Sequence, residues 1–188
     1  MAQSFAEWQL ADVHVTSKGA KQCQLSAAKE PVIYIPEEAL AVPFGLSSWE
    51  ESSRKNLELR CTSDVEASFL QLDEWARAYL VQHAERLFKK KLTPEQVAEN
   101  YRSPLTKRGD YPALLRTKIN TKGAARARIW NAQGVETEPP ENWRDFMVRL
   151  KLHIRSLWIM GTTFGFTIEC TDVQIVTPRR ACPFTVPA

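Results

Sequence analysis

Residues 101–130, YRSPLTKRGDYPALLRTKINTKGAARARIW, hold eight Lys or Arg residues against a single acid, Asp110. The whole chain has 25 basic and 22 acidic residues, so the sequence outside this stretch is net acidic. Three aromatic residues are interleaved with the charge: Tyr101, Tyr111 and Trp130. Cations follow a polyanionic backbone and flat rings stack on unpaired bases, so the stretch is typical of a surface that binds single-stranded nucleic acid. The plainer interpretation is a solvated basic face.

Alternating side chains within this stretch predict two strands, over residues 115–120 and 125–131. Residues 121–123, Thr-Lys-Gly, are typical of a hairpin connection between them. If the strands pair, their aliphatic side chains face the core and the other face of a two-stranded ribbon carries four cations and an indole. That face would consist of Arg116, Lys118, Arg126, Arg128 and Trp130.

The sequence before the basic stretch predicts strands followed by helices. Strand-like residues occur over 8–35 and 57–61, with a Pro-, Gly- and Ser-containing loop over 37–53. A long helix is expected to start at Ser63, which forms a capping-box pattern with a Glu three residues later, and an apolar stripe runs to residue 87. Thr93 and the proline after it predict a second, short helix that ends near residue 101.

The sequence after the basic stretch predicts more strands. Apolar and basic residues alternate over 148–155, residues 157–160 are apolar and expected to be central, and a Gly-Thr turn leads to alternation over 164–170 and a last strand at 173–176. Eight to ten short strands with an inserted helix pair predict a mainly β fold, a barrel resembling the oligonucleotide/oligosaccharide-binding (OB) type. A jelly-roll-like sandwich is the alternative. We expect one domain over residues 1–178, with a helical insertion at about 63–101, and a flexible tail over 179–188.

Composition restricts the setting of the protein. The chain of 188 residues contains no apolar run of the roughly 20 residues that a membrane helix needs, and its N-terminus lacks the pattern of a signal peptide. We therefore expect no membrane partner. Widely spaced cysteines predict free thiols and a reducing compartment, cytoplasmic or nuclear, or a viral replication site if the protein is viral. The cysteines are Cys23, Cys61, Cys170 and Cys182.

Motifs of catalysis are absent from the sequence. It has no phosphate-binding glycine loop, no nucleophile elbow and no zinc-protease helix. The paired acids Asp73 and Glu74 are expected on the solvated side of the long helix, off its apolar stripe. We therefore expect no enzymatic activity, no cofactor and no bound metal.

Further residues of the basic stretch complete the candidate binding set. Lys107, Arg108 and Lys122 would contact phosphates, and Tyr111 would stack on a base together with Trp130. Tyr101 is a minor candidate, because its place at a helix end also suits packing.

Five segments in the same order resemble a known family, the single-stranded DNA-binding proteins of large nucleocytoplasmic DNA viruses and their algal and protist relatives. The resemblance covers residues 32–176. The segments are VPFGLS at 42–47, KNLEL at 55–59, FLQLD at 69–73, YPALLRTKI at 111–119 and the hairpin at 157–167.

The resemblance implies an OB-type barrel, distantly similar to phage single-stranded DNA-binding proteins, that acts in DNA replication, repair or recombination. One departure concerns the tail: phage-type proteins end in acidic residues that recruit partners, whereas this chain ends PRRACPFTVPA over 178–188. Recruitment through the tail is therefore not expected from this sequence.

Single-stranded DNA is thus the expected partner, and self-association into a homo-oligomer is compatible with the sequence. RNA is an alternative ligand, because stacking and phosphate contacts do not involve the 2′-hydroxyl group that distinguishes RNA from DNA. A second alternative is a structural barrel whose basic face meets an acidic protein. A nuclease without a recognisable motif is the remaining alternative.

Overall fold

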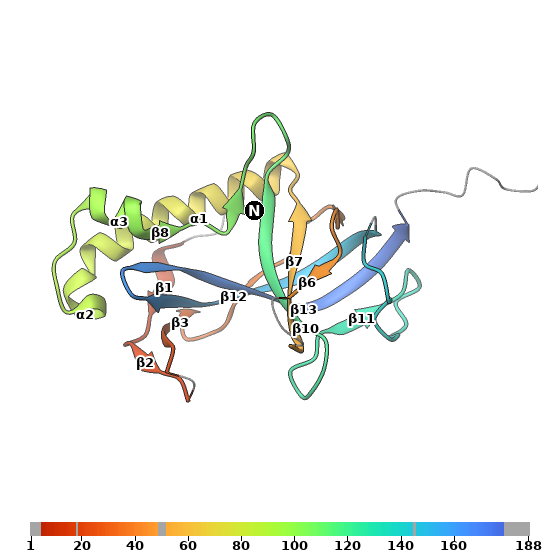
Figure 1. The fold of residues 1–188 in the computed structure, drawn as a ribbon, viewed down its shortest axis with the longest axis horizontal. Coiled ribbons are helices and arrows are strands. Elements are labelled where there is room, and N and C mark those ends of the chain that lie inside the picture. The colour runs from red at the N-terminus through yellow and green to blue at the C-terminus, as the bar shows by residue number, and fades with distance from the viewer. Residues whose placement is uncertain (1–4, 18, 49–51, 145, 179–188) are drawn as a thin grey trace, which may run out of the picture.

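The computed structural model describes residues 5–17, 19–48, 52–144 and 146–178 (Figure 1). The predicted tail over 179–188 lies outside the described residues. A short 3-10 helix, η1, precedes the strands. The elements are η1 (Phe5–Glu7), β1 (Trp8–Leu10), β2 (His14–Val15), β3 (Lys21–Ala27), β4 (Val32–Tyr34), β5 (Leu40–Ala41), β6 (Leu46–Ser47), β7 (Arg54–Arg60), α1 (Ser63–Gln82), α2 (Ala84–Phe88), α3 (Pro94–Asn100), β8 (Tyr101–Arg102), β9 (Leu105–Thr106), β10 (Leu114–Asn120), β11 (Arg128–Trp130), β12 (Phe146–Met160) and β13 (Thr163–Pro178).

A closed barrel forms the centre of the molecule. Strands β12 and β13 make a long antiparallel hairpin, and pairing continues from β12 through β5, β7 and β10 back to β13. Closure leaves these five strands without an exposed sheet edge that could pair with another chain, while β1 and β11 lie at the ends of the sheet. The predicted mainly β, OB-like fold with inserted helices is confirmed. The hairpin strands are longer than the sequence pattern indicated, because register shifts such as that between Lys151 and Leu152 let them bend and continue.

The predicted alternation in β10 is confirmed. Leu115, Thr117 and Ile119 are buried, and the side chains between them point outward. The hydroxyl of Thr117 donates a hydrogen bond to the backbone oxygen of Leu57 at 2.8 Å, so its burial leaves no unsatisfied donor. The barrel interior therefore fixes which face of β10 meets solvent.

The helices lie together on one side of the barrel, next to β8 (Figure 1). The N-cap of α1 is Thr62 rather than the predicted Ser63, because its side chain accepts the backbone N–H of Val65. The predicted start of the short helix at Thr93 is confirmed, and a capping box between Thr93 and Gln96 stabilises it. Helix α3 ends at residue 100, as expected.

The predicted hairpin between the two basic strands is wrong. Strands β8, β10 and β11 do not form ribbons with one another; each pairs in parallel with a successive part of β13. One edge of β13 is occupied by β12, and its other edge is long enough to satisfy the backbone groups of all three segments. The basic stretch therefore runs along a single strand edge, and β10 and β11 follow each other end to end.

Gly165 on β13 marks the closest approach between this edge and its neighbours. A Cβ atom at this position would lie 2.5 Å from the backbone oxygen of Arg102 and 3.0 Å from the ring of Trp158. We expect Gly165→Ala to lower the free energy of unfolding by roughly 1–3 kcal/mol, since neither neighbour can move freely. Urea denaturation measures this loss.

The control for this substitution is Gly134→Asn, at a positive φ of 75° with no atom within 4 Å of an added Cβ. Asn tolerates this conformation, so we expect a change below about 0.5 kcal/mol. Equal losses in the two variants would contradict the close packing at Gly165.

His153 on β12 has a buried Nε2 atom that lacks a hydrogen-bond partner. Burial lowers the pKa of His153 and Arg155 lowers it further, against an opposing effect of Glu169. The unfolded chain therefore takes up a proton first as the pH falls through about 6.5, and stability is lost below that pH. We expect His153→Gln to reduce this loss, measured as the free energy of unfolding at pH 7.5 and 5.5. An unchanged pH dependence in the variant would exclude His153 as its source.

Candidate nucleic-acid interface

The outer face of β7 and β10 carries polar and charged side chains in register. Arg116 lies opposite Glu58, Lys118 opposite Asn56, and Asn120 opposite the first residue of β7. Their inward-facing neighbours are buried, so these side chains point away from the barrel. Strand β10 thus places two of the predicted cations side by side on one outer surface.

A hollow of about 470 Å³ opens beside these cations, and we call it the basic groove. Strand β8 brings Arg102 to its wall through the pairing of residues 101–102 with 164–165, and β12 brings Trp158. No acidic residue is found among the described residues that line it. The polar and aromatic residues of the lining are Arg54, Asn56, Arg102, Ser103, Arg116, Thr117, Lys118, Trp158, Phe166 and Thr167.

Three cations of the basic groove are held by neutral acceptors. The guanidinium of Arg102 donates to the backbone oxygen of Glu99 at 2.6 Å, and that of Arg116 to the backbone oxygen of Ser103 at 2.9 Å. The ammonium of Lys118 donates to the side-chain oxygen of Asn56. These hydrogen bonds orient the cations without pairing them with a carboxylate.

Charge repulsion within the basic groove follows from this arrangement. Burial lowers the pKa of Lys118, and the nearby guanidinium groups of Arg54 and Arg116 lower it further. Arg54 itself is paired with Glu169 at 3.1 Å, a carboxylate that it shares with Arg155. An anion in the groove would relieve the repulsion around Lys118.

The other half of the predicted basic face is neutralised by acids. Arg126 forms ion pairs with Glu136 and Glu138, at 3.8 and 3.3 Å. Arg128 pairs with an acid on β13, Asp172, at 2.6 Å and lies over the ring of Trp130. The indole nitrogen of Trp130 donates to that same carboxylate at 3.4 Å. These acids come from outside residues 101–130, so the sequence pattern of the stretch could not show the neutralisation.

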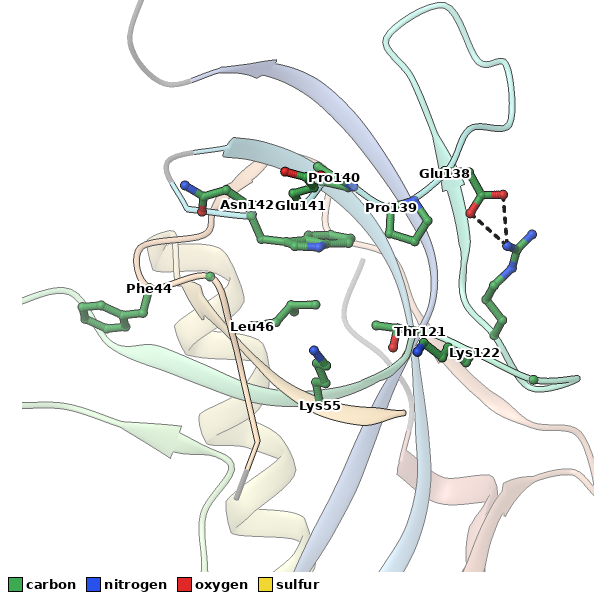
Figure 2. A pocket seen from close by; sticks show the side chains of 14 residues that line it. Phe44, Leu46, Lys55, Thr121, Lys122, Glu138, Pro139, Pro140, Glu141 and Asn142 are labelled. Carbon is green, nitrogen blue, oxygen red and sulfur yellow. Dashed lines mark hydrogen bonds and ion pairs between the residues drawn. The ribbon is translucent and has the colours of Figure 1, made fainter. Parts of the chain in front are cut away.

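The remaining predicted residues are spread over other surfaces. Lys107 pairs with Glu66 on α1 at 2.8 Å. Lys122 lines a basin of about 930 Å³ at one end of the barrel, where cations and acids are mixed. Figure 2 shows this basin, with Lys55 pointing into it from β7 and the ion pair of Glu138 at its edge.

Arg108 and Tyr111 line a separate hollow of about 300 Å³, which we call the aromatic hollow. Tyr111 is 77% exposed, and the other aromatic residue of the lining, Phe44, is 65% exposed. The full lining is Phe44, Glu58, Arg60, Thr106, Arg108, Tyr111, Pro112 and Leu114.

Asp73 is buried, which corrects the expectation of a solvated position. It is 3% exposed and accepts hydrogen bonds from the Tyr101 hydroxyl at 2.7 Å and from the Ser103 hydroxyl at 2.5 Å. Burial raises the pKa of Asp73. This contact ties α1 to the segment that carries Arg102 and the carbonyl that holds Arg116, and it places Tyr101 in the core rather than on a ligand surface.

Four residues that shape the interface were not in the predicted set: Arg54, Arg102, Trp158 and Asp73. Arg54 lay between the predicted loop over 37–53 and the predicted strand over 57–61, whereas β7 already begins at this residue. Arg102 belonged to the basic stretch but to neither of its predicted strands, and Trp158 belonged to an apolar run that was expected to be central. Asp73 lies four residues after Phe69, which is buried, and this helical spacing could have indicated its burial.

Other chemistry is limited within the part of the chain that the structure describes. That part contains no cluster of His, Cys, Asp or Glu suited to a metal ion, and none of its helices is long and apolar enough to span a membrane. The described cysteines are buried free thiols; burial raises the pKa of Cys23 to about 11, and those of Cys61 and Cys170 to about 12. Thiols with such pKa values are poor nucleophiles. Cys182 lies outside the described residues.

The chain matches no protein-family model and no curated protein sequence. Among solved structures it is similar to gp2.5, a single-stranded DNA-binding protein encoded by bacteriophage T7, with 13% identity and a TM-score of 0.52 over 77% of this chain and 86% of the phage protein. A single-stranded DNA-binding protein from bacteriophage Enc34, solved in complex with single-stranded DNA, matches with 12% identity and a TM-score of 0.48 over 94% of this chain and 99% of that protein. The likeness to the T7 protein shows that the two chains share a fold.

Proposed function

We propose that the chain is a non-enzymatic, largely sequence-independent single-stranded DNA-binding protein that acts in DNA replication, repair or recombination. The observation that carries the proposal is the basic groove, where Arg102, Arg116 and Lys118 are held by neutral acceptors beside Trp158. Cations of this kind are free to bind phosphates without first breaking an ion pair. The shared fold with a phage protein that binds single-stranded DNA supports the same interpretation.

Binding would combine two kinds of contact. The guanidinium and ammonium groups would contact successive phosphates, and each neutralised phosphate contributes by releasing counterions. The half-buried ring of Trp158 would stack on a base, which is worth about 1–3 kcal/mol per base in such proteins. Neither contact reads the identity of the base, so the binding is largely independent of sequence.

Unpaired bases are required for the stacking contact, because in a duplex the bases are already stacked on each other. The protein should therefore bind single-stranded DNA in preference to duplex DNA. Competition with an RNA oligomer of the same sequence tests the RNA alternative, and binding to a polyglutamate peptide but to no oligonucleotide would favour the structural module. Loss of intact oligomer in the presence of Mg²⁺ would instead reveal a nuclease.

The double substitution Arg116→Gln and Lys118→Gln should weaken binding to a fluorescent dT oligomer by tenfold or more, because charged hydrogen bonds to two phosphates can no longer form. Fluorescence anisotropy at several salt concentrations measures this. The slope of log affinity against log salt should become shallower by about 0.7 for each phosphate that the variant no longer neutralises. The free energy of unfolding should change by less than about 1 kcal/mol, because both side chains lie on the outer face of β10.

Arg126→Gln is the matched control, because this arginine lies in the same basic stretch but is paired with Glu136 and Glu138. We expect it to change the affinity by less than threefold and the salt slope by less than the groove substitutions do. A larger effect at Arg126 than at Arg116 and Lys118 would place the bound strand elsewhere.

Trp158→Ala should weaken binding roughly tenfold without changing the salt slope, because the variant cannot stack on a base but keeps every cation that binds phosphate. Trp130→Ala should have a smaller effect, since its ring is already engaged by Arg128 and its nitrogen by Asp172. Tryptophan fluorescence gives a second measurement: DNA should quench the wild-type emission, and Trp158→Phe should remove most of the quenching. Full quenching in Trp158→Phe would rule out stacking on this ring.

A further inference from the structure

We propose that the aromatic hollow captures one base of the bound strand and prefers a base with an exocyclic amino group, such as cytosine, over thymine. The inference rests on the proposed function and extends it to a second site on the same strands. The hollow is formed by Phe44 and Tyr111 as walls, with Glu58, Arg60 and Arg108 as its charged groups.

Both aromatic rings are exposed although their backbones are anchored. Phe44 lies two residues after Val42, which is fully buried and donates its backbone N–H to the backbone oxygen of Phe146 at 2.9 Å. Tyr111 lies on a turn closed by its own backbone N–H and the oxygen of Arg108 at 3.2 Å. Figure 2 shows the Phe44 ring pointing away from the basin at the barrel end. Because the backbone that carries these rings is already ordered, stacking a flat ligand on them requires ordering of the side chains alone.

Among the charged groups of the hollow, Glu58 favours a base over a phosphate at its own position. Glu58 forms no ion pair among the described residues, and its carboxylate would repel a phosphate while accepting a hydrogen bond from an amino group. Carboxylates accept such bonds from the N4 amino group of cytosine, whereas thymine has a carbonyl and a methyl group on the corresponding edge. Arg60 and Arg108 would hold the phosphates on either side of the captured base.

The aromatic hollow and the basic groove are neighbours along β7. The outward side chains of this strand are, in order, Arg60, Glu58, Asn56 and Arg54; the first two line the hollow and the last two line the groove. At about 3.3 Å per residue the row extends for roughly 20 Å, enough for several nucleotides of one strand. A DNA strand bound in the basic groove can therefore extend along β7 into the aromatic hollow.

Two oligomers of equal length, 5-methyl-dC and dT, test this preference. Both bases carry the same ring methyl, and they differ in the C4 group, amino against carbonyl, and in the proton on N3. The wild-type protein should bind the 5-methyl-dC oligomer three- to tenfold more tightly, a modest preference that leaves binding largely independent of sequence. Glu58→Gln should bring the ratio of the two affinities close to one, because an amide both donates and accepts a hydrogen bond. Equal affinities of the wild type for the two oligomers would overturn the preference.

The double substitution Phe44→Ala and Tyr111→Ala should weaken binding of both oligomers roughly tenfold with an unchanged salt slope. Phe44→Tyr and Tyr111→Phe keep the rings and should retain the affinity, and both rings are exposed, so the fold should survive every variant. If Arg116 and Lys118 prove necessary for binding but the ring and Glu58 variants bind as the wild type does, the inference about the hollow fails and the proposed function stands. If the wild type binds neither oligomer, both fail together.

Discussion

The edge of β13 that does not pair with β12 is the constraint on which the rest of the structure depends. Strand β12 covers one edge of β13, and the other edge must find partners for its backbone groups because unpaired groups inside a fold are costly. Strands β8, β10 and β11 supply those partners in turn, all in parallel. This backbone pairing aligns the basic stretch along β13 and brings Arg102 beside Arg116.

What distinguishes one cation from another in this protein is its hydrogen-bond partner. Arg116 donates a hydrogen bond to a backbone carbonyl and Lys118 to a side-chain amide, so both remain available to an anion in the groove. Arg126 and Arg128 instead form ion pairs with carboxylates. Surface ion pairs contribute little to stability, and their main consequence here is to remove charge from one half of the basic stretch. The buried contact of Asp73 with Ser103 then fixes the carbonyl that orients Arg116.

Local patterns in the sequence predicted the parts of the fold that depend on neighbours in the chain. The alternation of β10, the start of α3 at Thr93 and the inserted helices follow from side-chain period and cap chemistry, which act over a few residues. The parallel pairing with β13 could not be predicted, because it joins residues far apart in the sequence and competes with a hairpin that the turn residues favour. For the same reason, separation in the sequence, the ion pair of Arg128 with Asp172 and the position of Trp158 beside the basic groove could not be predicted.

Photo-crosslinking of an oligomer that contains 5-bromodeoxyuridine, followed by mass spectrometry of the peptides, tests the path of the bound strand most directly. The account predicts adducts on Trp158 and on peptides from residues 102–118, which form the walls of the basic groove and of the aromatic hollow. Adducts confined to the basin lined by Lys122 and residues 138–143, or to Trp130, would contradict it.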